Sequence, residues 1–218
     1  MTILKARLDK AAVKRVYEGL APMYDFWAHL TEAKARSRCM ELCAVKDGES
    51  VLEVAVGTGF AFAEIVRKNP HGRNEGIDLT LAMLSRARAR LAKGAGGNYH
   101  LQVADAYDLP FEDASFDLVV NNYMFDLLPE EDFGRVLGQM RRVLRPGGRL
   151  VLVNMAKGGS TLESLAEMVY RIRPEWMGGC RSVLLTPHVE AAGFVDVRRE
   201  IVTQMTFPSE VVSARVPS

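Results

Sequence analysis

The sequence predicts an α/β fold: a Rossmann-like, seven-stranded and mostly parallel sheet with an antiparallel edge hairpin and helices on both faces. From residue 50 onward, short valine-rich apolar runs alternate with segments of helical periodicity, which is typical of parallel strands joined by crossover helices. Near the end of the chain, two strand-like segments, from about Gly193 to Val202 and from Thr206 to Val216, predict the hairpin.

The predicted elements follow one another in the order that such a sheet requires. Strands are expected at residues 50–56, 75–78, 99–104, 116–121 and 149–154. Helices are expected at residues 61–68, 80–91 and 130–144, the second of them capped by Thr80. The run Arg145-Pro146-Gly147-Gly148 predicts a turn before the last of these strands.

A length of 218 residues suits one α/β domain with additions better than two domains. We expect a single domain over residues 1–218, because no internal repeat, low-complexity tract or linker divides it. Residues 1–45 are expected to form an N-terminal helical lid, and residues 46–156 the ligand-binding core. Residues 157–218 are expected to hold an insertion and then the terminal hairpin.

Charge and composition exclude several classes of function. Lys and Arg number 28 against 27 Asp and Glu, so the chain lacks the broad positive field of a nucleic-acid-binding protein. No apolar run approaches a membrane span and the N-terminus lacks a signal-peptide layout, so we expect a cytoplasmic protein. The three cysteines form no CxxC pair; we expect reduced thiols, with Cys39 and Cys43 packed on one helix face, and no metal site.

Residues 3–20 have apolar side chains at helical spacing with basic residues among them, which predicts an amphipathic N-terminal helix. We favour a helix that lies over the domain, because it also carries Asp9 and Glu18 and few large apolar residues. The alternative is peripheral contact with an anionic membrane surface, at the inner membrane face, aided by Phe26 and Trp27.

The first strand ends in Gly57-Thr58-Gly59, a bend whose glycines let the backbone approach a ligand at the carboxyl ends of the strands. A dinucleotide fingerprint needs glycine or alanine three residues beyond its second glycine. The sequence has Phe62 there, or Phe60 if the count begins at Ala55. A bulky residue at either position disfavours a pyrophosphate on the helix N-terminus, so NAD or FAD is the minority interpretation.

Carboxylates lie on or after successive strands near this bend. Asp78 ends the second strand, where an acid can accept both hydroxyls of a ribose. Asp105 follows the third strand, where it can accept from an adenine amino group, and Glu53 lies on the first. Each acid alone could simply cap a turn or a helix. Together, at successive strand ends, the three acids predict a ligand with an adenosine portion.

Four segments, in this order and spacing, resemble the motifs of class I S-adenosylmethionine-dependent methyltransferases. They are VLEVAVGTG (51–59), GIDLT (76–80), ADAYDLPFEDASFDLVV (104–120) and RVLRPGGRLVLVN (142–154). The similarity covers roughly residues 15–215, and it is greatest to UbiE-type quinone methyltransferases and bacterial phospholipid N-methyltransferases. The motifs are specific for the cofactor, S-adenosyl-L-methionine, and say little about the acceptor.

The resemblance implies that the bend binds the methionine portion of this cofactor. Gly57, Thr58 and Gly59 would contact that portion. Glu53 would organise the loop and reach the amino end, and Asn121, at the end of the fourth strand, would lie beside the sulfonium.

The later motifs are implied to hold the adenosine portion. Asp78 would hold the ribose, and Leu79 and Met83 would pack near the adenine. Asp105 and the backbone of Ala106 would contact the edge of the base.

The sequence departs from the commonest family pattern at Ala55, where that pattern has its first glycine. A methyl group should be tolerated there if the backbone lies in the β region. The departure bears on the geometry of the loop rather than on the identity of the cofactor.

Methyl transfer requires alignment and exclusion of water more than a dedicated base. Residues 17–27 resemble the family's N-terminal tyrosine motif, part of a lid, and Tyr24 is the first candidate to lie near the transferring methyl group. Tyr24 could instead only pin its helix to the core. Tyr123 is similarly placed after the fourth strand, and His29 and His188 are weaker candidates for a base.

We therefore expect a methyltransferase that acts on a hydrophobic or amphipathic small molecule, such as a quinone precursor or a phospholipid amine. The Met, Trp and Tyr side chains of residues 157–181 favour an apolar acceptor pocket or, equally, ordinary packing. The alternatives are an N- or S-methyltransferase of a small soluble metabolite and a non-catalytic S-adenosylmethionine-binding module. The sequence leaves a monomer and a homodimer open.

Overall fold

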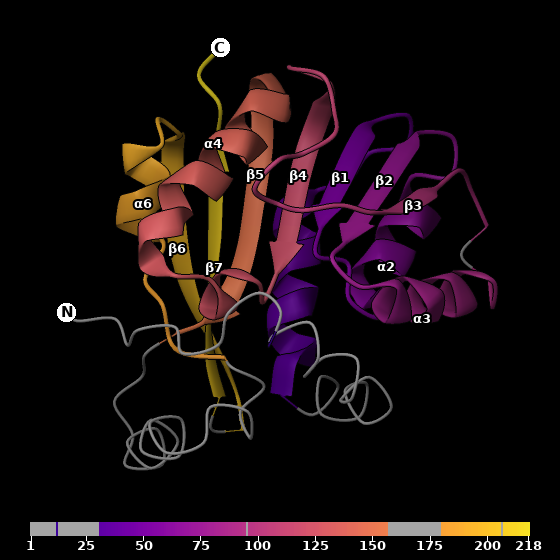
Figure 1. Cartoon of the computed structure of the whole chain (residues 1–218), viewed down its shortest axis with the longest axis horizontal. Helices are drawn as coiled ribbons and strands as arrows, with labels where there is room; N and C mark the ends of the chain where they lie inside the picture. Colours follow the sequence, from indigo (N-terminus) through magenta and orange to yellow (C-terminus); the bar gives the residue numbers. More distant parts are fainter. Residues whose placement is uncertain (1–11, 13–30, 95, 157–179, 206) are drawn as a thin grey trace.

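The computed structural model describes residue 12 and residues 31–94, 96–156, 180–205 and 207–218. These residues form a seven-stranded sheet in the order β3-β2-β1-β4-β5-β7-β6 (Figure 1). Its strands are β1 (Ser50–Val54), β2 (Arg73–Asp78), β3 (His100–Val103), β4 (Phe116–Asn122), β5 (Leu144–Met155), β6 (Val195–Gln204) and β7 (Phe207–Arg215). The predicted fold class is confirmed.

Strand direction places the ligand-binding rim. β1 pairs in parallel with both β2 and β4, β2 with β3, and β4 with β5. The hairpin strand β7 lies antiparallel between β5 and β6. The chain therefore leaves β1 toward one side and returns on its other side at β4. Such a switch in strand order opens a crevice at the carboxyl ends of the strands, where open α/β sheets bind their ligands.

Helices cover both faces of the sheet. The longer ones are α2 (Phe60–Lys68), α3 (Leu81–Leu91), α4 (Phe133–Val143) and a helix over residues 31–43, and α6 (Thr186–Ala191) is short. Alternate residues of β5 divide the core: Leu150 and Leu152 pack with α4 and α6, whereas Val151 and Val153 pack with residues of α2 and helix 31–43. Figure 1 shows α4 crossing in front of β5.

The two largest differences from the predicted boundaries lie at α4 and β5. The helix expected at residues 130–144 begins with a separate 3-10 turn, η2 (Glu130–Asp132), before α4. β5 begins at Leu144 rather than at residue 149, because Leu144 already pairs with Phe116 and the next pair joins Arg149 to Leu118. The predicted Arg-Pro-Gly-Gly turn is therefore an irregularity inside the strand.

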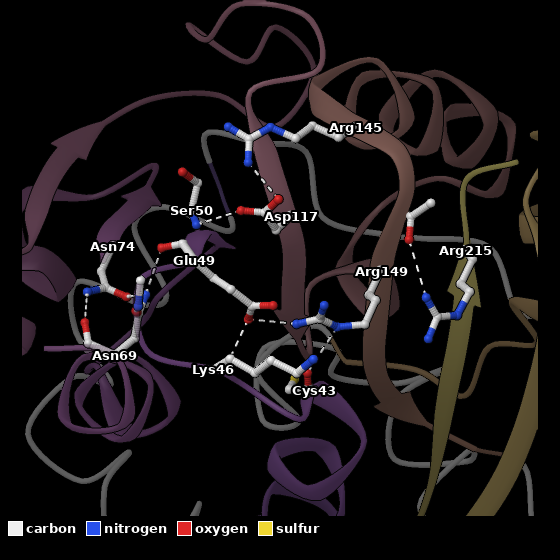
Figure 2. Close-up of polar contacts among 12 residues, drawn as sticks. Cys43, Lys46, Glu49, Ser50, Asn69, Asn74, Asp117, Arg145, Arg149 and Arg215 are labelled. Atoms are coloured by element: carbon white, nitrogen blue, oxygen red, sulfur yellow. Dashed lines mark hydrogen bonds and ion pairs between the residues drawn. The ribbon is translucent and has the colours of Figure 1, made fainter. Parts of the chain in front are cut away.

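Polar side chains hold the amino ends of the strands (Figure 2). Arg149 donates to Glu49 Oε2 over 2.8 Å and to the carbonyl of Cys43 over 3.2 Å. Asp117 accepts from the amide of Ser50 at 2.8 Å and from Arg145 at 2.6 Å. These contacts tie β1, β4 and β5 together at one rim, and the opposite rim carries the cavities.

The helix over residues 31–43 bears the first two cysteines. Cys39 and Cys43 are buried, with their Sγ atoms 3.9 Å apart, so the expected packing on one helix face is confirmed. Among the described residues, no helix is both long and apolar enough to span a bilayer. The predicted amphipathic helix 3–20, Tyr24, His29 and residues 157–179 lie outside the described residues.

Candidate functional site

A cavity of about 890 Å³ opens at the carboxyl ends of β1 to β4. Residues at the ends of these strands and in the segments that follow them line it: Val54, Ala55 and Gly57; Ile77 to Thr80, with Met83; Ala104 to Tyr107; and Asn122 to Met124, with Leu127 and Leu128. Six of the residues predicted to contact the cofactor are among them, namely Gly57, Asp78, Leu79, Met83, Asp105 and Ala106. We call it the main cavity.

The bend after β1 is held by left-handed backbone conformations. Gly57 and Gly59 have φ angles of 57° and 83°. A Cβ atom at Gly59 would lie 2.9 Å from Ala87 of α3, whereas one at Gly57 would meet no atom within 4 Å. Gly59 thus allows α2 to begin against α3, and Gly57 keeps open the space next to the main cavity.

Ala55 corrects an expectation from the sequence. We expected its methyl group to be tolerated in the β region, but its φ is 59°, in the left-handed region that favours glycine. The chain turns there because it must leave β1 and form the bend within a few residues. Ala55 therefore adopts a backbone conformation that glycine adopts at less cost, and it lines the main cavity.

Asp78 is buried and joins two parts of the site. Its Oδ2 accepts from the Gly57 amide at 2.9 Å, and its Oδ1 accepts from the Thr80 amide and hydroxyl at 2.9 and 3.0 Å. Thr80 in turn caps α3. Burial raises the pKa of Asp78, and these hydrogen bonds oppose that shift. The acid thus positions the glycine bend as well as facing the main cavity.

Asp105, which follows β3, also lines the main cavity. Its Oδ1 accepts from the amide of Tyr107 at 3.1 Å, which fixes the turn after β3. The Tyr107 hydroxyl donates to Asp132 at 2.7 Å, and the Arg135 guanidinium lies 5.2 Å from the Tyr107 ring centroid. Burial and the hydrogen bond to Asp132 raise the pKa of Tyr107. Tyr107 therefore lines the main cavity next to Asp105, the acid that was predicted to contact adenine.

A second cavity of about 420 Å³ adjoins the first. The two share Ala55, Gly57, Asn122 and Tyr123 as lining residues. The smaller cavity is also lined by Glu32, Arg36, Glu53, Val56, Thr58, Phe60 and Ala61. We call it the side cavity. Thr58, predicted to contact the methionine portion, faces this side cavity rather than the main one.

Glu32 and Arg36 were missed by the sequence reasoning. They lie on helix 31–43, a stretch with no motif, and only their spacing of one helical turn puts them on a common face. The Arg36 guanidinium lies 4.6 Å from the Phe60 ring centroid, and Arg90 lies 3.5 Å from the same centroid. Arg90 also donates to the carbonyl of Thr58 at 2.9 Å, so the first turn of α2 is clamped beside the side cavity.

Glu53 is a buried acid with an unused oxygen. It is 1% exposed, and its Oε1 accepts from Asn122 Nδ2 at 3.3 Å. No hydrogen-bond partner for Oε2 is found in the described part of the chain. Burial raises the pKa of Glu53 to about 8. A buried acceptor without a donor is costly, so this oxygen fits a ligand that brings an N–H group into the side cavity.

Asn121 and Asn122 point to opposite faces of β4 because strand side chains alternate. Asn121 is fully buried, donates to the carbonyl of Val54 at 2.7 Å and lines neither cavity. Asn122 lines both, although Asn121 was the residue expected near the sulfonium. The sequence predicted that β4 ends at residue 121, but the strand continues to Asn122. The asparagine at its end, which borders the cavities, is therefore one residue later than predicted.

Tyr123 lies where the two cavities meet. Its backbone φ is 55°, and its hydroxyl lies 2.8 Å from Ser209 Oγ. Burial, together with the charges of Glu32 and Asp126, raises the pKa of Tyr123. His188 lines neither cavity; it contacts Glu130 at 3.2 Å. No group of three or more acidic, His or Cys side chains suited to a metal ion occurs within the described ranges.

Comparison with known sequences finds methyltransferases. Residues 51–148 match the family model for a methyltransferase domain. A demethylmenaquinone methyltransferase from Thermotoga maritima is 35% identical over 150 residues, which are 67% of this chain and 62% of that protein. This chain therefore spans less than two thirds of the length of that relative.

Solved structures share the fold. The cyclase SpnF has a TM-score of 0.77 at 18% identity, covering 99% of both chains. Phosphoethanolamine N-methyltransferase 2 of Haemonchus contortus, in complex with S-adenosyl-L-methionine, has a TM-score of 0.67 at 18% identity. That match covers 85% of this chain and 53% of the other. At such identities the likeness concerns the fold alone.

Proposed function

Because this chain belongs to the class I S-adenosylmethionine-dependent methyltransferases, we propose that it methylates a hydrophobic or amphipathic small molecule at the junction of its two cavities. One observation carries the proposal: acids from successive strands and the glycine bend border two cavities that meet at Tyr123. The main cavity offers acids to an adenosine, and the side cavity offers Glu53 and Arg36 to a charged amino-acid tail.

The residues present fit the cofactor. Asp78 would hold the ribose hydroxyls, Asp105 and the Ala106 amide the adenine edge, with Leu79 and Met83 packed beside the ring. In the side cavity the unused oxygen of Glu53 would accept from the amino group. Arg36, stacked on Phe60, would pair with the carboxylate. When bound, S-adenosylmethionine supplies a methyl group on a positively charged sulfur that is open to in-line displacement.

The protein's own contribution is alignment. The Tyr123 ring lines both cavities and would wall the sulfur end, where an aromatic face favours a cation. Its hydroxyl is held by Ser209, so the ring is fixed in place. Tyr24 remains our candidate for closing the site over the acceptor. Tight walls exclude water, which would otherwise separate the acceptor from the methyl group.

We propose that residues 157–181 contribute an apolar part of the acceptor pocket. The apolar side chains noted there in the sequence support this choice. Peripheral contact of the N-terminal helix with a membrane surface is the alternative to a helix that lies over the domain. A chain that binds vesicles of anionic phospholipid in a flotation assay would agree with it, and one that stays in solution at low ionic strength would point to a soluble acceptor.

Calorimetry with S-adenosylhomocysteine tests the cofactor assignment. We expect binding by the parent chain, a loss of at least tenfold in affinity for Glu53→Gln and Arg36→Leu, and no change for Glu131→Gln, an exposed acid outside both cavities. Release of S-adenosylhomocysteine from S-adenosylmethionine is then measured with lipid, quinol, amine and thiol acceptors. A folded sample that binds neither compound would overturn the proposal.

A further inference from the structure

Asp126 is a fully buried acid that the proposed cofactor site does not use. It lies in the 3-10 turn η1 (Phe125–Leu127), directly after the segment that contains Tyr123. The residue is 0% exposed, and neither carboxylate oxygen accepts a hydrogen bond from a side chain in the described residues; the backbone amides of Asp126 and Met155 are the donors that favour its charged form. Proteins rarely bury a charged group in this way without a function for it, because the desolvation penalty is not recovered.

The cations near Asp126 are already engaged elsewhere. The Arg181 guanidinium donates to the Asp126 carbonyl oxygen at 2.7 Å and to the carbonyls of Phe125 and Leu128, not to the carboxylate. On the far side, Glu210 adds negative charge, and its own partner is Arg199 at 2.7 Å. The charge of Arg181 favours the ionised form of Asp126 and that of Glu210 opposes it to a smaller extent, but no salt bridge to the Asp126 carboxylate is found in the described part of the chain.

Glu32 is the acid near Asp126 that lines the side cavity. Its carboxyl lines the cavity beside Tyr123, and the charge of Asp126 acts on it. Arg36 is one helical turn away, the usual spacing for an ion pair, but the two side chains form no salt bridge in the described structure. Both are thus available to a ligand: Arg36 for an anion and Glu32 for a cation.

We propose that the methyl acceptor is an amine, bound as its ammonium ion by Glu32 next to Tyr123, with Asp126 as the buried acid that positions and strengthens this cation site. The inference rests on the proposed function and names its substrate class. It assigns Glu32 the contact with the acceptor. Asp126 does not line a cavity and acts through Glu32 and Tyr123.

The charge balance of the reaction favours an amine over a quinol or a thiol. An ammonium ion must lose one proton before it attacks: an N–H bond breaks, the proton passes to the Glu32 carboxylate, and the nitrogen keeps the electron pair. That pair forms the N–C bond while the C–S pair stays on sulfur. A phenol or a thiol would instead become an anion, which neighbouring carboxylates repel.

The protonation states agree with this role. Burial raises the pKa of Glu32 to about 7, with Asp126 adding to the shift and Arg36 opposing it. Burial also raises the pKa of Asp126 to about 7. A carboxyl with such a pKa can accept a proton from an ammonium ion and release it again near neutral pH.

A matched pair of probes tests the cation site without requiring turnover. Octylammonium and 1-octanol have the same chain and differ in charge. On the full chain saturated with S-adenosylhomocysteine, we expect calorimetry to give at least tenfold tighter binding of octylammonium. Glu32→Gln and Asp126→Asn should each reduce this preference to less than threefold, while Glu131→Gln should leave it unchanged.

The outcomes separate the possible errors. If S-adenosylhomocysteine does not bind, the proposed function fails and this inference fails with it. If it binds but octanol binds as well as octylammonium, only the amine assignment is wrong. Asp126→Asn should weaken ammonium binding without lowering the melting temperature, since it removes an unpaired buried charge. A variant that loses both stability and binding would show that Asp126 is merely structural.

Discussion

The Gly57 amide donates to Asp78 Oδ2 over 2.9 Å, so the acid assigned to the ribose also holds the glycine bend. Its other oxygen holds Thr80, the cap of α3. One carboxylate therefore links the ends of β1 and β2 to the start of a helix. Ligand affinity and local stability should change together when it is altered.

Asp78→Asn is expected to lower both the stability of the fold and the affinity for the ligand. An asparagine offers one oxygen and one NH₂ group, so either Gly57 or Thr80 would face a donor instead of an acceptor. We expect a loss of about 1–3 kcal/mol in the free energy of unfolding and at least a tenfold loss of affinity for S-adenosylhomocysteine. Urea denaturation and calorimetry measure the two. The exposed Glu112→Gln serves as the control, and an Asp78→Asn chain of unchanged stability would refute the link.

Gly57 and Gly59 form a natural pair for testing backbone strain against steric contact. Both have positive φ, but only Gly59 has an atom 2.9 Å from where a Cβ would lie. Gly57→Ala should cost about 1 kcal/mol through strain alone. Gly59→Ala should cost about 1–3 kcal/mol more, because α2 and α3 must separate. If thermal or urea unfolding shows that the two variants lose the same stability, α2 and α3 can move apart without a measurable cost, which would contradict the predicted difference.

Replacing Ala55 with glycine should stabilise the folded protein. Its φ of 59° is strained for any residue with a Cβ, so Ala55→Gly is expected to raise the free energy of unfolding by up to about 1 kcal/mol. Ala114, exposed and with a φ of 49°, gives a matched control outside the cavities, and Ala114→Gly should show a similar gain. Destabilisation at Ala55 alone would indicate that its methyl group contributes packing greater than the strain.

The stability of the parent chain should fall as pH rises, and Asp126 should account for part of this. Its pKa is about 7 in the fold and 3.8 in the unfolded chain, so the folded state binds more protons between these values. Asp126→Asn removes that dependence. Its gain in unfolding free energy should be near zero at pH 4 and on the order of 4 kcal/mol at pH 8. Denaturation curves at several pH values check it; a constant difference would contradict the burial of an unpaired acid.

Local pattern predicted most of the fold, and contact between distant segments explains what it missed. Valine-rich runs and glycine bends located the core strands to within a few residues, because alternation and turn chemistry are local properties. The left-handed form of Ala55 could not be seen, since alanine carries no signal for it. The early start of β5 depends on pairing between Leu144 and Phe116, which sequence spacing does not reveal.

The same division holds for the site. Residues within motifs, such as Asp78 and Asp105, were predicted because each follows a recognisable strand. Glu32, Arg36 and Asp126 were not, since a helix without a motif and a short turn bring them to Tyr123 only after folding. Asp126 did leave one trace in the sequence: an acid among Met124, Phe125 and Leu127, in a stretch that is otherwise apolar.

The polar network at the amino ends of the strands has an evolutionary consequence. Arg149, Asp117 and their partners secure strand register at the rim opposite the cavities (Figure 2). Cavity-facing residues of helix 31–43, such as Glu32 and Arg36, can therefore change while the contacts that hold the strand register stay in place.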